Sequence, residues 1–278
     1  MARTGQLTGK TAIVCGGSKG IGYSAATEVV RRGGSVAIVA RGNGTLDPAV
    51  QQLRLLVKDA SQFVEAIQAD AADRNDIGPK LDAFVTSRGV PDLLINAVGF
   101  AGPDYVGNLG LEQFRLHMDV NYYGQLIPTL VVLPHLMEAR RGHIAFVSSM
   151  MGYFGVIGYA AYAPTKFALV GLAEVLRHEL KPAGISVSVL YPPDTDTPGF
   201  EAENVTKPAE THALSANVKL AQPDDVAREF VDGIMQGKFH ILPSGAAMPW
   251  RLQRYAPRLV RAFLDRDLSK ARRRIGKT

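Results

Sequence analysis

Short apolar runs alternate along the chain with longer segments of helical periodicity. The runs lie at residues 11–15, 35–40, 65–70, 92–96, 143–148, 185–190 and 239–242. They are almost continuously apolar, which is typical of strands covered on both faces, and the segments between them are long enough for crossover helices. The pattern predicts an α/β fold built on a doubly wound parallel sheet of about seven strands, with helices on both faces.

The two longest helical patterns lie at residues 111–139 and 159–181. The second predicts a buried stripe made by Phe167, Leu169, Val170, Leu172, Ala173, Leu176 and Leu180. The first contains Gly124 and Pro128, and Pro128 has no N–H to donate to the carbonyl of residue 124. We expect a kink there that exposes Asn121, which is itself a poor helix former.

Composition sets the domain organisation. The chain has 278 residues, 46% of them hydrophobic, enough for one large core. We predict a single large domain at residues 1–248 and a basic amphipathic extension at residues 249–278. Cys15 is the only cysteine, so we expect no disulfide and a cytoplasmic location. The chain shows no signal-peptide core, and its longest apolar segment, residues 126–137, is too short and too proline-broken to span a bilayer.

Positive charge is concentrated in the extension. Residues 249–278 hold ten Lys or Arg and two Asp, a local net charge of +8, whereas the whole chain carries +5. The body is therefore slightly acidic, and because no nucleic-acid-reading motif accompanies the basic segment, nucleic-acid binding is the weakest functional interpretation. The six His and the single Cys show no metal-ligand spacing, so we expect no metal.

The extension is also amphipathic. Its apolar positions are Trp250, Leu252, Tyr255, Leu259, Val260, Phe263, Leu264 and Leu268, with arginines between them. This pattern predicts one of two arrangements. The segment docks peripherally on anionic lipid at the cytoplasmic membrane face, or it packs on its own domain or on a partner subunit, with Arg272, Arg273 and Arg274 disordered.

A glycine-rich turn, GGSKGIG, follows the first predicted strand and opens a helix that runs to about Arg32. Gly16, Gly20 and Gly22 permit a tight turn and let backbone N–H groups approach a diphosphate, as in Rossmann-type sheets. A plain strand-to-helix turn is the alternative. The second strand ends in Ala40 and Arg41 in place of an acid that would hold a ribose, and Lys19 adds a second cation. These cations favour the 2′-phosphate of NADP(H) over NAD(H), unless they are ordinary solvated charges.

Four residues are candidates for catalysis. Tyr162 and Lys166 are four apart in the first turns of the second long helix, and therefore on one face. An adjacent ammonium is expected to lower the phenol pKa from about 10, so that Tyr162 gives a proton to a carbonyl oxygen. Ser149, at the end of the fifth strand, would orient that oxygen, and Asn121 would hold a water near Lys166. Each residue type also occurs at such positions without a catalytic role.

Together these motifs resemble the short-chain dehydrogenase/reductase family over residues 9–200, through GGSKGIG, INAVG, NYYG, SSMMG and YAPTK. The resemblance implies that Asn121, Ser149, Tyr162 and Lys166 form a catalytic tetrad. The positions expected to contact NADP(H) are Gly16, Ser18, Lys19, Gly20, Ile21, Gly22, Arg41, Asp70, Asn96, Gly99, Tyr162, Lys166, Pro192, Thr195 and Thr197. Helices like 111–139 and 159–181 pair subunits in this family, which implies a homodimer or homotetramer.

The run YPPDTDTPGF at residues 191–200 resembles that of one subfamily, the 3-ketodihydrosphingosine reductases. This resemblance implies NADPH-dependent reduction of a long-chain amino ketone in sphingolipid biosynthesis. Two alternatives stay open: a reductase of another apolar ketone, such as a 3-oxoacyl thioester or a steroid, and a non-catalytic NADP-binding interaction protein.

Two acids in this run, Asp194 and Asp196, are candidate substrate ligands. The implied substrate carries an ammonium one bond from its ketone, and a nearby carboxylate would hold it. Loop aspartates also cap helices or face water. Thr197 and Pro198 predict the N-cap and first residue of a lid helix, with Glu201 and Glu203 in its early turns, where acids suit the helix dipole.

Overall fold

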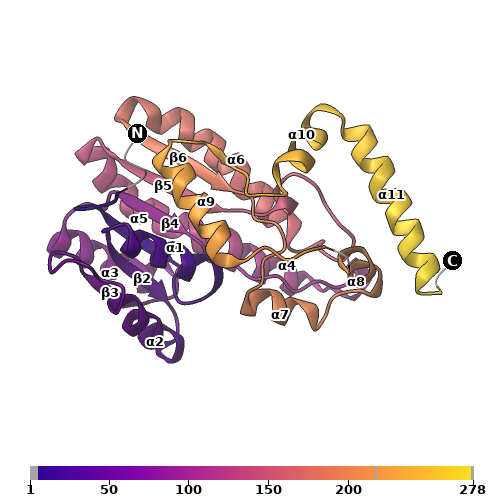
Figure 1. The fold of residues 1–278 in the computed structure, drawn as a ribbon, viewed down its shortest axis with the longest axis horizontal. Coiled ribbons are helices and arrows are strands. Elements are labelled where there is room, and N and C mark those ends of the chain that lie inside the picture. Colours follow the sequence, from indigo (N-terminus) through magenta and orange to yellow (C-terminus); the bar gives the residue numbers. More distant parts are fainter. Residues whose placement is uncertain (1–5, 217, 277–278) are drawn as a thin grey trace.

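The computed structural model describes residues 6–216 and 218–276. Seven parallel strands form one sheet in the order β3-β2-β1-β4-β5-β6-β7 (Figure 1). The strands are β1 (Thr11–Cys15), β2 (Ser35–Ala40), β3 (Val64–Gln68), β4 (Leu93–Asn96), β5 (Gly142–Val147), β6 (Ile185–Leu190) and β7 (His240–Ile241). The predicted doubly wound sheet is confirmed, and the order reverses between β1 and β4, where such sheets bind ligands.

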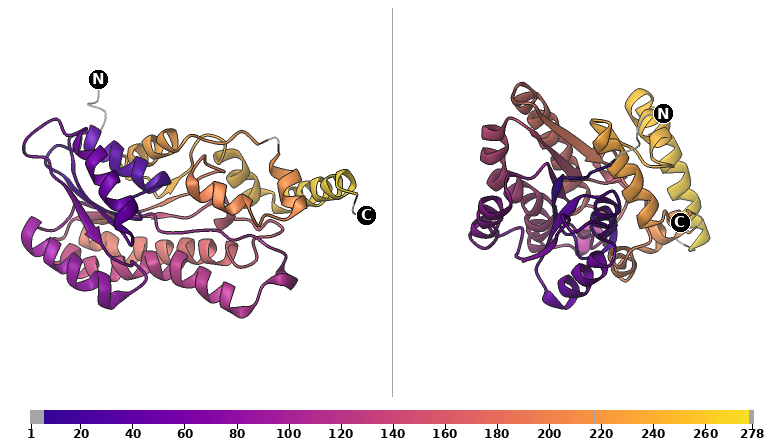
Figure 2. Two further views of the ribbon diagram at one scale, coloured as in Figure 1. Left: turned by 90° about the horizontal axis from the view of Figure 1, so that it is seen from below. Right: turned by 60° about the vertical axis from the view of Figure 1, so that its left-hand side comes forward.

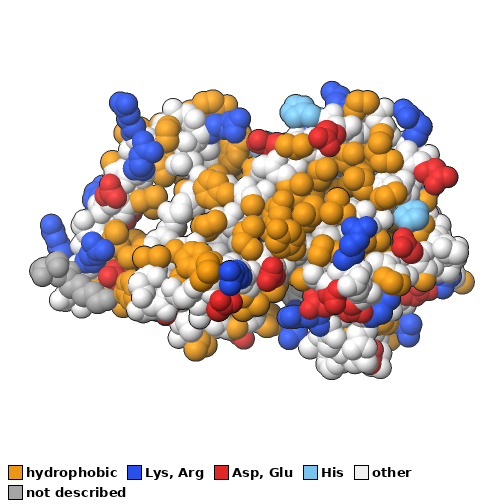
Figure 3. Space-filling model, turned by 180° about the vertical axis from the view of Figure 1, so that it is seen from behind, with side chains coloured by type: hydrophobic (Ala, Val, Ile, Leu, Met, Phe, Trp, Pro, Cys, Tyr) orange, Lys and Arg blue, Asp and Glu red, His pale blue; other side chains and the backbone are white. Residues whose placement is uncertain are grey.

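Helices cover both faces of the sheet, as the view from below shows (Figure 2). One layer holds α1 (Gly20–Arg31), α2 (Asn43–Arg54) and α9 (Pro223–Met235). The other holds α3 (Arg74–Arg88), α5 (Gly124–Ala139) and α6 (Ala163–Leu180). Apolar side chains gather on the outer surface of this second layer (Figure 3). Those exposed on α5 and α6 are Leu130, Met137, Phe167 and Val175.

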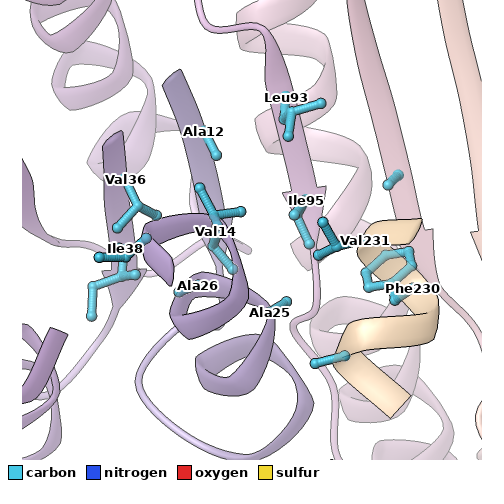
Figure 4. Close-up of a cluster of buried hydrophobic side chains, with 14 of the residues drawn as sticks. Ala12, Val14, Ala25, Ala26, Val36, Ile38, Leu93, Ile95, Phe230 and Val231 are labelled. Carbon is cyan, nitrogen blue, oxygen red and sulfur yellow. The ribbon is translucent and has the colours of Figure 1, made fainter. Parts of the chain in front are cut away.

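The core follows the period of two that a strand imposes. On β1, Ala12 and Val14 face the α1 and α9 layer, whereas Ile13 and Cys15 face the opposite layer. Figure 4 shows the first cluster, in which α1 contributes Ala25 and Ala26 and α9 contributes Phe230 and Val231. The small alanines let α1 approach the sheet closely, which places the helix N-terminus at the end of β1.

The first long helix contains a π-helical turn. It consists of α4 (Leu111–His117), the π turn η2 (Met118–Tyr123) and α5. The expected exposure of Asn121 is wrong, because this residue is fully buried. Its Nδ2 donates to Phe100 O at 3.0 Å and its Oδ1 accepts from Phe100 N at 2.8 Å. Both ends of the amide are satisfied inside the protein, so burial carries no unpaired polar group.

The second long helix is shorter than predicted, because α6 begins at Ala163 and the preceding residues form turns. Tyr162 is the N-cap and Pro164 lies in the first turn, where its missing N–H costs nothing. Within the predicted stripe, Leu169, Ala173, Leu176 and Leu180 are buried. Phe167 is 45% exposed, which contradicts its predicted burial. It precedes the buried Leu169 by two residues, and residues two apart in an α-helix point to nearly opposite sides.

The C-terminal part forms a partly separate layer. After β6 come α7 (Pro198–Asn204) and α8 (Ala209–Ser215), and after β7 come α10 (Ala247–Tyr255) and α11 (Pro257–Arg274). Helix α11, yellow in Figure 1, runs away from the sheet, and its C-terminal end contacts α8. Ala271 is buried at this contact, and Arg272 Nε lies 3.8 Å from Glu210 Oε1. Short 3-10 turns lie at η1 (Val106–Asn108), η3 (Met150–Gly152) and η4 (Lys181–Ala183). Among the described residues, no helix combines the length and the apolar character needed to cross a bilayer.

Candidate active site at the carboxyl edge of the sheet

The glycine turn after β1 has room for glycine only. Gly16 has a φ of +80°, and a Cβ there would lie 2.9 Å from Ala97 C. A Cβ at Gly22 would lie 2.2 Å from Gly16 O. The first intrahelical bond of α1 runs from Tyr23 N to Lys19 O at 3.1 Å, so the N–H groups before Tyr23 face the end of the sheet. This cradle fits a dinucleotide diphosphate.

Cations lie where the sequence predicted them. Arg41 follows β2 directly; its side chain is 70% exposed, with Nη1 3.9 Å from Asp70 Oδ2 at the end of neighbouring β3. Lys19 is the exposed N-cap of α1. Ser18, which precedes Lys19 in the turn, accepts from Thr45 Oγ1 at 3.3 Å. The structure thus brings the predicted adenosine-side residues together on one edge.

Asn96 has a buried structural contact. Its Nδ2 donates to Thr129 Oγ1 on α5 at 3.0 Å, and its Oδ1 is one of the few buried polar atoms without a partner among the described residues. The chain then passes Gly99, where a Cβ would lie 3.1 Å from Lys166 Nζ. The backbone after β4 therefore reaches the candidate catalytic residues, whereas the Asn96 side chain is directed at α5.

Ser149, Tyr162 and Lys166 meet at the ends of β5 and α6. Ser149 is hydrogen-bonded to the Tyr162 phenol, and its Oγ also accepts from Met151 N at 3.1 Å. Lys166 is buried; its Nζ donates to Val147 O at 3.1 Å and lies 5.5 Å from the centroid of the Tyr162 ring. Asn121 reaches this group through Thr165, which accepts from Asn121 Nδ2 at 3.2 Å. All four predicted residues thus lie in one region.

The protonation behaviour of Tyr162 differs from the expected one. Burial raises the phenol pKa above its ordinary value, while the hydrogen bond with Ser149 opposes the rise. Burial also lowers the pKa of Lys166 to about 7, because an ammonium is disfavoured away from water. The expectation that Lys166 lowers the pKa of the Tyr162 phenol is therefore wrong for the protein without a bound cofactor. The neutral phenol is the form that donates a proton, and burial keeps Tyr162 in that form.

The loop after β6 places its two acids differently. Asp194 is half-buried and burial raises its pKa, whereas Asp196 is exposed. Thr195 is buried and donates to Pro193 O at 2.7 Å, and Pro192 O accepts from Met150 N at 3.2 Å in the turn after Ser149. The loop is therefore joined to the Ser149 turn, and only the first acid lies inside.

The predicted lid helix begins as expected. Thr197 is the N-cap of α7, and its Oγ1 accepts from Phe200 N at 3.2 Å. A Cβ at Gly20 would lie 3.2 Å from Thr197 Cγ2, so the N-terminus of α7 lies against the glycine turn. The lid thus begins beside the candidate cofactor cradle.

Three further residues of the region were not singled out from the sequence as functional. The hydroxyl of Tyr159 donates to Glu203 Oε1, and Lys207 Nζ lies 3.2 Å from the same oxygen. The spacing of Glu203 and Lys207 was the one available signal, but it is typical of exposed ion pairs and says nothing about burial. Within residues 6–216 and 218–276, no group of His, Cys, Asp and Glu side chains could hold a metal ion.

Comparison with known proteins agrees with this geometry. The family model for short chain dehydrogenases matches residues 10–208. The chain is 40% identical to 3-dehydrosphinganine reductase of Danio rerio, over 84% of this chain and 71% of the relative, and 40% identical to 3-ketodihydrosphingosine reductase of Dictyostelium discoideum, over 85% and 75%.

Solved structures show the same fold. One is the apo form of LigD from Sphingobium sp. strain SYK-6, with a TM-score of 0.75 at 22% identity, covering 94% of this chain and 98% of that one. Another is a 3-oxoacyl-[acyl-carrier protein] reductase with bound NAD from Brucella melitensis, with a TM-score of 0.67 at 26% identity, covering 80% and 82%. These matches agree with the sheet, the glycine cradle and the cluster of Ser149, Tyr162 and Lys166. The chain therefore belongs to the short-chain dehydrogenase/reductase family and is an oxidoreductase that acts on a ketone/alcohol pair.

Proposed function

We propose that the protein reduces 3-ketodihydrosphingosine to dihydrosphingosine with NADPH. The observation that carries the reductase chemistry is the enclosed Tyr162 phenol, hydrogen-bonded to Ser149 and beside buried Lys166. The substrate comes from the relatives, which bear that activity in their names at 37–40% identity.

Each residue of the cluster has a distinct task in this proposal. Bound NADPH supplies a hydride to the carbonyl carbon. Tyr162 protonates the carbonyl oxygen, and Ser149 donates a hydrogen bond that orients it. Lys166, held by Val147 O, restores the proton of Tyr162, and its pKa of about 7 suits proton exchange near neutral pH. Asn121 is a positioning residue, because it fixes the backbone at Phe100, next to Gly99 and Lys166.

The cofactor cradle in this proposal selects NADP(H). The first-turn N–H groups of α1 take the diphosphate, and Arg41 and Lys19 face the 2′-phosphate. The remaining predicted contacts are Ser18, Ile21, Asp70, Asn96, Gly99, Pro192, Thr195 and Thr197; of these, Asn96 contributes through its backbone, because its side chain is engaged by Thr129.

A substrate panel tests the proposal. NADPH oxidation is expected to be faster with a 3-keto-2-amino lipid than with a 3-oxoacyl thioester or a steroid of similar length, and faster with NADPH than with NADH. Equal or faster turnover of the thioester would reassign the substrate while leaving the reductase chemistry in place. Absence of turnover with every ketone would favour the non-catalytic interpretation.

We also propose that α10 and α11 dock on anionic lipid at the cytoplasmic membrane face. Their exposed apolar side chains are Met248, Leu252, Tyr255, Leu259 and Phe263. Arginines flank them, and each cation near an anionic surface adds about 1 kcal/mol. Helix α11 packs on the rest of the protein mainly through its end, at Ala271 and Arg272, so the middle of the helix is free to contact lipid. Lys277 lies outside the described residues.

Charging the apolar positions tests the docking. The double variant Leu259→Glu and Phe263→Glu is expected to reduce binding to phosphatidylglycerol vesicles about tenfold or more, because two side chains lose their apolar burial. Co-sedimentation measures this, with Leu55→Glu, an exposed leucine at the end of α2, as control. Unchanged vesicle binding of the double variant would contradict docking through this surface.

The apolar surface of α5 and α6 supports a homodimer or homotetramer (Figure 3). Leu130, Met137, Phe167 and Val175 are exposed there, and contiguous exposed apolar side chains mark interfaces. Sedimentation equilibrium is expected to give a mass of at least two chains, and a monomer at micromolar concentration would contradict this proposal.

A further inference from the structure

A buried ion pair that the proposed reaction does not use lies in the loop region over the active site. The side chain of Lys207 is 1% exposed; its Nζ lies 3.2 Å from Glu203 Oε1 and 4.4 Å from the centroid of the Phe200 ring. Lys and Glu are almost never buried unless paired, and removing both charges from water is costly. An exposed pair would join α7 to the following turn equally well, so the burial calls for another explanation.

The pair lies next to the catalytic phenol. Tyr159 donates its hydroxyl to Glu203, and its ring centroid is 5.9 Å from that of Tyr162. The charges of Glu203 and Asp194 both contribute to the raised pKa of Tyr162, so both carboxylates are within electrostatic reach of the phenol. The proton donor and the two carboxylates therefore share one enclosed region.

Lys207 is the cation that these two carboxylates share. Lys207 is the cation that lowers the pKa of Asp194, but burial raises that pKa more strongly. Burial alone sets the pKa of Lys166, to which neither carboxylate contributes. Lys207 thus interacts with both carboxylates, contacting Glu203 directly and lowering the pKa of Asp194.

We propose that Asp194 and Glu203 form a two-carboxylate site for the ammonium group of the substrate, and that Lys207 is the resident counter-ion with which this ammonium competes. The inference rests on the proposed function, in which the ammonium is one bond from the carbonyl whose oxygen Tyr162 protonates. A substrate held by Tyr162 and Ser149 therefore places its ammonium beside the phenol, within electrostatic reach of both carboxylates. The site distinguishes an amino ketone from an otherwise equal ketone.

Product-analogue binding tests the site without requiring turnover. Calorimetry with NADP⁺ present compares 2-aminooctan-3-ol with octan-3-ol. Wild-type protein is expected to bind the amino alcohol at least about tenfold more tightly, because charge-assisted hydrogen bonds are the strong ones. Glu203→Gln and Asp194→Asn are each expected to reduce this preference about threefold or more. Lys207→Met is expected to increase it, because a competing cation is removed.

Matched controls separate recognition from lid stability. Glu201→Gln and Asp196→Asn make the same charge changes at exposed positions of the same segment and are expected to keep the wild-type preference. Lys207→Arg keeps the charge and is expected to do the same. If Lys207→Met does not fold, the two carboxylate variants still decide the matter.

Three results would overturn the inference. They are equal binding of the two alcohols by wild-type protein, equal weakening of both alcohols in Lys207→Met, and loss of preference in the exposed controls. Amine preference in wild-type protein without turnover of 3-ketodihydrosphingosine would instead overturn the proposed function and leave the ammonium site standing.

Discussion

Replacing Tyr162 with phenylalanine is expected to lower turnover at least about 100-fold while NADPH binding persists, since general acid catalysis contributes that much or more. The variant removes one hydroxyl and leaves the ring beside Lys166 and Tyr159. Stopped-flow measurement of NADPH oxidation, together with NADPH fluorescence titration, separates the chemical step from cofactor binding.

Tyr123→Phe is the matched control, because Tyr123 is exposed and its hydroxyl lies outside the cluster. It is expected to retain wild-type turnover. Retained activity in Tyr162→Phe would rule out Tyr162 as the proton donor. A parallel loss of NADPH affinity would show that the hydroxyl serves cofactor binding more than proton transfer.

Replacing Gly22 with alanine is expected to weaken NADPH binding about tenfold or more and to lower the free energy of unfolding by about 1–3 kcal/mol, as overpacking does. The added Cβ would lie 2.2 Å from Gly16 O, a backbone atom that no side-chain rotation can move. The glycine turn must therefore open, and the first-turn N–H groups of α1 no longer point toward the proposed diphosphate site. Fluorescence titration and urea unfolding measure the two effects.

Gly44→Ala is the control for this change. Gly44 lies in α2, and a Cβ there would meet nothing within 4 Å. Because alanine is the better helix former, this variant is expected to be as stable as wild-type protein or more stable. Unchanged NADPH affinity in Gly22→Ala would contradict the placement of the cofactor against this turn.

The fold was predictable because its signals are local. Strand alternation, the glycine turn, the Thr197 cap and the Tyr162 and Lys166 spacing each need only a few neighbouring residues. Predictions about exposure failed more often. Asn121 was expected at the surface, yet its partner Phe100 lies 21 residues away in the chain. Phe167 was expected inside, yet its side of α6 has no covering element in the described part of this chain.

The region around the phenol shows the same limit in its electrostatics. The sequence favoured a phenol pKa lowered by Lys166, a statement about two residues one turn apart. The phenol pKa is raised mainly by burial, and the carboxylates of Glu203 and Asp194, which lie beyond β6 in the chain, add to the rise. Pairwise spacing reports the neighbours on one helix, but desolvation depends on every element that closes over the site.

The sequence by itself determined the family and the sheet and predicted the cofactor turn and the candidate catalytic residues, because periodicity and motif spacing act within single elements. Only the tertiary structure decided which acid of YPPDTDTPGF faces inward, that Lys207 is buried against Glu203, and that Tyr159 joins them from 44 residues away. The physical reason is that burial and charge pairing depend on contacts between segments distant in the chain, and the local sequence pattern does not specify those contacts.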